Sequence, residues 1–447
     1  MKLTYEDSLA HFLEAFAASK QYSEEAAAYI PGSYSRRTFN FGPHAVYVDR
    51  AEGAYLYTVD GRKLLDFNNN YTVSVLGYQN KAVDRAIRNA MKKGYSLGNP
   101  TVEESNLAKM LTERVASMEQ VKFSCSASES CLSAVRIARA YTGKKKIAKM
   151  EGGYHGFIDE LAFSAHPNPA ASAKDLTALK PQAESAGILD DIAENIVLLT
   201  QNNIEASEQV LRAHADEIAC VIMELQSGSG GIVVLEPDYV KKMRELTKEL
   251  GIVLIFDETI SIRADRGGLQ NVYQVKPDLT VTGKSVGGGL PLGVVGGSKE
   301  VMSVVTRDEV KISGTHHGHR LACAAGIATL RQMDEHNLYE YLNALANRIK
   351  NELNAWAEER NYAFHVFGCH SVIAYAFTKE PGQRIQTHRD YWRYTDAEKM
   401  QTFALEAAVR GYFPVHRGEL SMNAAMTPED ITRFIADVKE IIVEMMA

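Results

Sequence analysis

The chain has 447 residues and an ordinary globular composition, with 45% hydrophobic and 23% charged residues. Its formal net charge of −7 argues against nucleic acid and anionic membranes as partners, because both attract basic surfaces. The five cysteines are scattered and form no CxxC pair, so we expect reduced thiols, a cytoplasmic protein, and neither a disulfide framework nor a zinc site.

The N-terminal stretch and the turn after it are the first predicted elements. Residues 1–20 mix acidic and apolar residues at helical spacing, which predicts a helix rather than a signal peptide or a membrane span. No later stretch reaches the roughly 18 uncharged apolar residues that a spanning helix needs. Asp60 and Gly61 then separate two apolar runs, a pattern typical of a β-hairpin.

From about residue 100, helix-type and strand-type segments alternate. Short apolar runs that predict strands lie at 121–126, 146–150, 195–200, 218–225, 252–258 and 279–283. Amphipathic stretches lie between them, such as 237–251, which has Pro237 at its start and Gly251 as a stop signal. Apolar strands that alternate with helices predict an α/β fold, in which helices cover both faces of a mostly parallel sheet.

Beyond about residue 322 the pattern changes to long helices with a short strand region at 365–377. The final helix is expected to begin with Thr427 as its N-cap and Pro428 as its first residue. We therefore expect a large domain over residues 76–321. A smaller α+β domain would be built from both chain ends, with residues 1–75 as N-terminal segment and residues 322–447 as the C-terminal part.

Polar residues at three predicted strand ends carry the chemistry. Asp257 ends one strand, Lys284 follows the next, and Ser126 and Ser128 lie where a strand turns into a helix. Ligands of such sheets bind beyond the carboxyl ends of the strands, and a helix start suits a phosphate. A lysine, a carboxylate and a phosphate cup together are what pyridoxal phosphate requires, although each alone is typical of an ordinary strand end or helix cap.

Two long blocks of sequence carry a family resemblance. One begins "SCSASES" at residue 124 and ends "EGGYHG" at residue 156; the other begins "IFDET" at residue 255 and runs through Lys284 to Gly297. From about residue 30 onward the chain resembles the class III pyridoxal-phosphate aminotransferases, especially the branch of glutamate-1-semialdehyde aminomutase and the β-amino-acid aminotransferases. The resemblance implies the pyridoxal-phosphate transferase fold of type I, with pyridoxal 5′-phosphate as the cofactor.

The resemblance also implies roles for individual residues. Lys284 is similar to the lysine that binds the cofactor and moves the substrate proton, and Asp257 to the partner of the pyridine nitrogen. Arg36, which competes with Arg37, is similar to an arginine that grips a substrate carboxylate. Thr315 matches a hydroxyl that reaches the phosphate of the neighbouring subunit, which implies a homodimer with shared active sites. The other implied cofactor contacts are Ser126, Ala127 and Ser128 at the phosphate, Tyr154 on the ring, Glu224 beside the pocket, and Thr259 in place of the usual Val or Ile.

Several positions raise questions that the resemblance leaves open. The dense glycines after Lys284 are expected to leave room for the ring, the phosphate and the substrate. Ala127 stands where the family has a glycine, so a positive φ there would cost about 1 kcal/mol. His316, His317 and His319 invite a metal hypothesis, but no acidic or thiol partner is near in sequence, so a polar pocket wall or a structural role is favoured and no metal site is expected.

Together these features predict an aminotransferase that moves an amino group between an amino acid and a 2-oxo acid, with β-amino acids and amino-carbonyl compounds among the candidate donors. Lys284 would be the proton carrier, and His155 would be structural rather than a base. An intramolecular aminomutase is the alternative, and the departures from the family pattern keep a racemase or lyase open. A cofactor-binding regulatory protein is disfavoured, because Lys284 and Asp257 are both present and no basic arm is attached.

Overall fold

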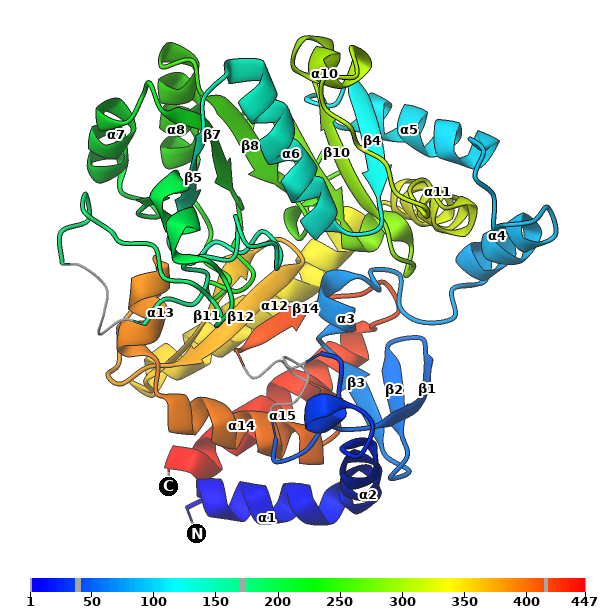
Figure 1. Ribbon diagram of the computed structural model, residues 1–447. Helices are drawn as coiled ribbons and strands as arrows, with labels where there is room; N and C mark the ends of the chain where they lie inside the picture. The colour runs from blue at the N-terminus through cyan, green and yellow to red at the C-terminus, as the bar shows by residue number, and fades with distance from the viewer. Residues whose placement is uncertain (1, 37–41, 169–173, 414–416, 447) are drawn as a thin grey trace. The chain divides into compact units, whose positions relative to one another are not determined.

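Contacts between residues divide the chain of the computed structural model into two compact units (Figure 1). The structure describes residues 2–36, 42–168, 174–413 and 417–446. The first unit comprises residues 1–80, 340–384 and 394–447, and the second comprises residues 81–339 and 385–393. The domain limits expected from the sequence, at residues 75 and 321, are not the limits of these units and stay a prediction.

The second unit is built around a seven-stranded sheet with the strand order β4-β10-β9-β8-β7-β5-β6. Six strands run in one direction, and β10 is antiparallel to both of its neighbours. β7, β8 and β9 are buried along their whole length, as expected where helices cover both faces. The mostly parallel sheet predicted from the sequence is therefore confirmed. The strands are β4 (Gln120–Ser124), β5 (Lys146–Met150), β6 (Ile196–Leu199), β7 (Ile218–Met223), β8 (Val253–Asp257), β9 (Leu279–Gly283) and β10 (Gly293–Gly297).

Helices pack on the two faces of this sheet. α6 and α10 bury apolar side chains against one face, in a cluster that includes Ile137, Val301, Ile255 and Val281. α5 and α11 contribute to a second cluster with β4 and β10. The helices are α4 (Lys81–Met91), α5 (Val102–Arg114), α6 (Ala127–Thr142), α7 (Ile204–Ala213), α8 (Pro237–Glu249), α9 (Leu269–Tyr273), α10 (Lys299–Thr306), α11 (Arg320–Glu335) and α13 (His388–Tyr394), with short 3-10 turns η3 (Asp190–Asn195), η4 (Ser261–Arg263) and η5 (Lys284–Gly287).

The first unit holds two smaller sheets and the helices of both chain ends. β2 and β3 pair antiparallel around the turn at Asp60 and Gly61, which confirms the predicted hairpin. The strands are β1 (Val48–Glu52), β2 (Tyr55–Thr58), β3 (Lys63–Asp66) and β13 (Tyr412–Phe413) in one sheet, and β11 (Phe364–Cys369), β12 (Val372–Phe377) and β14 (Glu419–Ser421) in the other. The helices are α1 (Tyr5–Ala15), α2 (Ala17–Ala26), η1 (Pro31–Ser33), α3 (Asn69–Thr72), α12 (Leu338–Glu359), α14 (Ala397–Val409) and α15 (Pro428–Met446). Among the helices described, none combines the length and apolar character needed to cross a membrane.

The glycines around β10 differ from their expected role. A Cβ on Gly293 would lie 2.1 Å from the carbonyl oxygen of Ser126, and one on Gly297 would lie 2.5 Å from Leu279 Cδ2. These glycines let β10 pack tightly against protein segments on either side. The expectation that they leave room for a cofactor was therefore wrong at these positions. Because the segment is rich in glycine, the sequence pattern also did not predict strand β10.

Candidate active site

The residues singled out at predicted strand ends lie along one edge of the large sheet. Asp257 is the last residue of β8, Glu224 follows β7, and Lys284 follows β9. The turn into α6 follows β4, and the loop that carries Tyr154 follows β5. Because these strands run in the same direction, their carboxyl ends share an edge, which is where ligands of such sheets bind.

The Asp257 carboxylate is almost fully buried, with 4% of the residue exposed, and it is bonded from several sides. Oδ2 lies 3.0 Å from Nδ1 of His155 and 3.5 Å from Sγ of Cys131. Oδ1 accepts hydrogen bonds from the backbone N–H of Thr259 at 3.1 Å and from its hydroxyl at 2.5 Å. Burial by itself raises the pKa of Asp257, but His155 and the bonds from Thr259 outweigh it and hold the pKa below its usual value. The carboxylate is thus kept as an anion.

His155 is the main support of this carboxylate. Burial lowers the pKa of His155 although the bond to Asp257 opposes the shift, so the imidazole is neutral and donates from Nδ1. Its Nε2 is buried without a hydrogen-bond partner in the part of the chain that the structure describes. Sequence reasoning named His155 only as structural and did not select Cys131, which lies in α6 and meets Asp257 only in the fold.

Glu224 is a second buried carboxylate beside the first. Oε2 accepts the backbone N–H of Tyr154 at 2.8 Å, and Oε1 accepts that of Gly228 at 2.9 Å. Burial and the charge of Asp257 raise the pKa of Glu224, while these two hydrogen bonds and the Lys284 ammonium oppose the increase. The charge of Lys284 therefore reaches Glu224, which in turn interacts with Asp257, so three of the predicted residues belong to one electrostatic group.

Lys284 begins the η5 turn with a left-handed backbone, at φ +50°. Such a conformation is uncommon for a residue other than glycine and persists where the surroundings impose it, often at functional sites. The residue is partly exposed. Gly283, just before it, packs against the start of α6, because a Cβ there would lie 3.3 Å from the Cβ of Ala127.

The start of α6 has the features expected of a phosphate cup. Ser126 is the N-cap, and its hydroxyl accepts the backbone N–H of Glu129 at 3.3 Å. Ala127 is the first helical residue and is not among the residues with positive φ, so the strain that a positive φ would cause does not arise. Gly156 packs on Ser128, since a Cβ there would lie 2.3 Å from Ser128 Oγ. The N–H groups of this helix start favour an anion.

The remaining predicted residues of the second unit lie nearer the surface. Tyr154 is 42% exposed, which leaves its ring open to a stacking partner. The hydroxyl of Thr259, expected near the cofactor ring, donates a hydrogen bond to Asp257. Thr315 is exposed in a turn over residues 315–318, as a residue that contacts a second subunit would be. The roles of these three residues toward a cofactor stay predictions.

Arg36 belongs to the first unit, where it lies beside Tyr71. Its Nη1 donates to Oδ1 of Asn70, and its guanidinium carbon lies 5.5 Å from the centroid of the Tyr71 ring. Arg417 donates from Nη2 to the Tyr71 hydroxyl at 3.4 Å. Arg36 and Arg417 thus both contact Tyr71, and the role of Arg36 toward a substrate stays a prediction. Arg37, the competing candidate, lies outside the described residues.

Comparison with known proteins decides the family. The family model of class-III aminotransferases matches residues 38–400. The chain belongs to the class III aminotransferases. A curated relative from Caldivirga maquilingensis, named glutamate-1-semialdehyde 2,1-aminomutase, is 34% identical over 91% of this chain and 93% of its own length.

Two solved structures show the same fold as this class III aminotransferase. An omega-transaminase from Sphaerobacter thermophilus has a TM-score of 0.89 and 30% identity, covering 96% of this chain and 98% of its own. A β-phenylalanine aminotransferase from Variovorax paradoxus has a TM-score of 0.88 and 28% identity, covering 98% of this chain and 96% of its own. The pyridoxal-phosphate fold of type I, predicted from the resemblance, is confirmed.

Class III aminotransferases depend on pyridoxal 5′-phosphate, and the sheet edge fits this cofactor. A buried carboxylate held as an anion, Asp257, is the partner that a protonated pyridine nitrogen needs. The capped start of α6 offers N–H groups to a phosphate, and Lys284 offers an amine at the neighbouring strand end. The cofactor predicted from the sequence is therefore confirmed, whereas the assignment of each residue to it is a proposal.

Proposed function

We propose that this class III aminotransferase moves an amino group between an amino acid and a 2-oxo acid, with β-amino acids and amino-carbonyl compounds among the candidate donors. The observation that carries the proposal is the anionic Asp257 carboxylate at the same sheet edge as Lys284 and the start of α6. The transaminases among the solved relatives support amino transfer, because they cover nearly the whole chain.

Each residue of the edge has one task in this proposal. Pyridoxal phosphate, when bound, takes up the electrons of the bond that is broken at the substrate carbon. Asp257 keeps the proton on the pyridine nitrogen, and His155 holds Asp257 in place. The amine of Lys284 removes the proton from the carbon that bears the substrate nitrogen and then returns this proton to a different carbon atom. Ser126, Ala127 and Ser128 bind the phosphate, Tyr154 stacks on the ring, and Glu224 and Thr259 shape the pocket beside it.

Arg36 binds the carboxylate of the donor in this proposal. Its fork of N–H groups matches a carboxylate through two parallel hydrogen bonds, which a lysine ammonium cannot offer. Arg36 already donates to a neutral amide, that of Asn70, so a charged acceptor would be the stronger partner.

The active protein is a homodimer with shared sites in this proposal. The support is Thr315, which lies exposed in the turn over residues 315–318, as a residue that contacts a second subunit would. Two copies would then complete each other's cofactor pocket.

An intramolecular aminomutase is the second candidate, since the relative from Caldivirga maquilingensis carries that name over 91% of this chain. Both reactions use the same residues but differ in their need for an acceptor. The purified holoenzyme is incubated with a panel of donors, with and without a 2-oxo acid, and the products are identified by mass spectrometry.

We expect repeated turnover only when the 2-oxo acid is present, with one new amino acid formed from the acceptor for each donor consumed. Lys284→Ala serves as the inactive control. Sustained conversion of a donor into its positional isomer without acceptor would assign the protein as an aminomutase, and acceptor-free loss of chirality would assign a racemase.

A further inference from the structure

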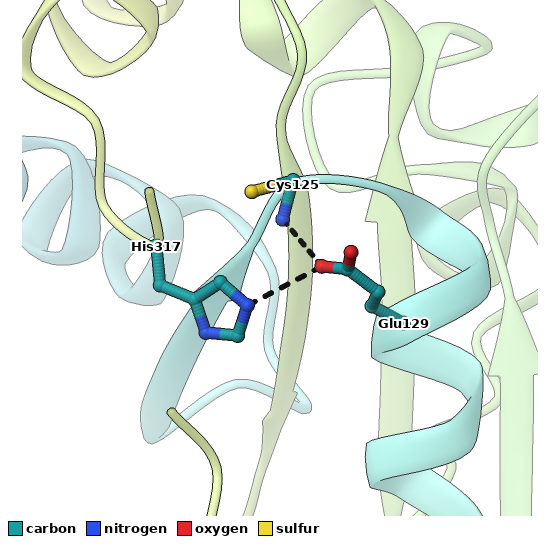
Figure 2. A group of neighbouring side chains, drawn as sticks. All are labelled: Cys125, Glu129 and His317. Carbon is teal, nitrogen blue, oxygen red and sulfur yellow. Dashed lines mark hydrogen bonds and ion pairs between the residues drawn. The ribbon is translucent and has the colours of Figure 1, made fainter. Parts of the chain in front are cut away.

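A thiol, a carboxylate and an imidazole come together beside the start of α6 (Figure 2). One ligand atom each from Cys125, Glu129 and His317 lie within 4.8 Å of one another. Cys125 and Glu129 flank the first turn of the helix, whereas His317 comes from the turn before α11. The fold thus supplies the acid and thiol partners for His317 that its sequence neighbourhood lacks.

Gly314 leaves the space in which the imidazole of His317 lies. A Cβ on Gly314 would lie 2.4 Å from Nε2 of His317, so the ring occupies the space that a side chain at residue 314 would fill. Nε2 lies 3.3 Å from Oε2 of Glu129. Nδ1 is buried and lacks a hydrogen-bond partner among the described residues. The ring is therefore positioned against a carboxylate and has an unused nitrogen.

Glu129 faces His317 while it remains tied to the helix start. Oε2 also accepts the backbone N–H of Cys125 at 2.8 Å, which fixes the carboxylate between the other two residues. Figure 2 shows this arrangement, with dashed lines from the same oxygen to Cys125 and to His317. The three residues are each only partly exposed, so an ion there would keep access to solvent.

We propose that Cys125, Glu129 and His317 form a binding site for one zinc ion, with a water molecule as the fourth ligand. Zinc accepts thiolate, imidazole and carboxylate ligands together and prefers a tetrahedron, whose ligand atoms are about 3.5 Å apart. The observed spread of up to 4.8 Å needs only a side-chain adjustment of about 1 Å. A thiolate with an imidazole favours zinc over magnesium or calcium.

The charges at the site agree with a divalent cation. When zinc displaces the thiol proton of Cys125, the thiolate and the Glu129 carboxylate together carry −2, which offsets the charge of the ion. The second cluster with suitable ligand atoms, Cys131, His155 and Asp257, does not serve this purpose, because its carboxylate belongs to the proposed cofactor site.

The test uses the holoenzyme after dialysis against a chelator that is then removed. Zinc chloride is titrated by calorimetry, retained metal is counted by elemental analysis, and X-ray absorption at the zinc edge reports the ligand atoms. We expect one zinc per chain with one sulfur ligand. Cys125→Ser, Glu129→Gln and His317→Gln should each weaken zinc binding by more than about tenfold, because losing even a residue that only supports a metal ligand costs about 10- to 100-fold. Gly314→Ala should do the same, because it displaces the imidazole.

His316→Gln is the matched control, since it removes the exposed imidazole next in sequence and should leave zinc binding unchanged. The proposal would be overturned if zinc bound equally well to Cys125→Ser and His317→Gln. It would also be overturned if the wild type bound no zinc, or if the absorption spectrum showed no sulfur ligand. Zinc held by the cofactor phosphate would persist in these variants and vanish from the cofactor-free protein, which also contradicts the site. None of these measurements depends on turnover, so they stand apart from the proposed reaction.

Discussion

Nδ1 of His155 lies 3.0 Å from Oδ2 of Asp257, and both side chains are almost completely buried. The contact ties the loop after β5 to the end of β8, across the intervening strand β7. It is the largest influence that keeps the Asp257 carboxylate ionised against its burial. The proposed function therefore depends on a residue that acts through Asp257.

His155→Ala is expected to lower kcat by roughly 10- to 100-fold, the effect of losing a hydrogen bond to a charged group of about 1.5–3 kcal/mol. His155→Asn should recover part of the loss, because its amide can donate from nearly the position of Nδ1. The pH profile of kcat and the absorption spectrum of the bound cofactor are recorded for both variants. Equal loss in both, with unchanged spectra, would show that the bulk of the ring matters and the hydrogen bond does not.

Asp257→Asn is expected to fold and to bind the cofactor but to lose most activity, more than about 100-fold. A neutral amide cannot hold a proton on the pyridine nitrogen. Thr259→Val, which removes only the hydroxyl bonded to Oδ1, should give a smaller loss. Cofactor content by absorbance and kcat by product formation are the measurements. Turnover of Asp257→Asn near that of the wild type would exclude the assigned role.

Arg36→Ala should weaken donors that carry a carboxylate by about 1.5–3 kcal/mol, the range for a hydrogen bond to a charged group. Simple amines offer no carboxylate and should be used almost as well as by the wild type. The readout is kcat/KM for matched pairs of amines and amino acids. Arg50→Ala is the control, because Arg50 also lies over a tyrosine ring, that of Tyr57. Equal losses for amines and amino acids would remove Arg36 from the substrate site.

We predict that the buried side chain of His365 makes the free energy of unfolding fall as the pH is lowered. The residue lies in β11 with 4% exposed, and within the described residues neither ring nitrogen has a hydrogen-bond partner. Burial, with a smaller effect of Arg384, lowers the pKa of His365 to about 4. An unfolded histidine has a pKa near 6.5, so below that pH the unfolded state binds a proton that the folded state refuses. This contribution is present above about pH 6.5 and is lost as pH falls toward 4.

The size of this effect is up to about 3 kcal/mol, since each pKa unit corresponds to about 1.4 kcal/mol. Urea unfolding of the wild type and of His365→Phe is compared between about pH 7 and pH 4. The wild type should lose stability more steeply than the variant, which keeps a ring but no titrating group. Parallel curves for the two proteins would contradict the prediction.

Sequence reasoning was most informative where a local pattern determines a local structure. Apolar runs located the parallel strands, and the order of strand ends then grouped Asp257 and Lys284, because parallel strands share a carboxyl edge. β10 was missed, since its glycines serve close packing and carry no strand pattern. Whether Ala127 needs a positive φ could not be read from the sequence, and the structure shows that it begins a helix without one.

Contacts between distant segments could not be predicted from one sequence. Cys131 and His155 meet Asp257 from α6 and from the loop after β5, and neither position is marked by spacing. His317 was set aside as a metal ligand for want of a nearby acid or thiol, yet the fold brings Cys125 and Glu129 to it. Such clusters depend on how α6 and α11 pack on the sheet, which no local pattern encodes.

The proposed function requires that Lys284 be the residue that binds the cofactor covalently. Borohydride reduces the linkage between the cofactor and its lysine, and mass spectrometry of the digested protein then locates the modified peptide. We predict that the label lies on Lys284 and that Lys284→Ala carries none. Lys149 offers a stringent comparison, because its ammonium is fully buried and donates to the carbonyl oxygens of Gly153 and Phe163. A label on Lys149 or on any lysine other than Lys284 would contradict the proposed mechanism.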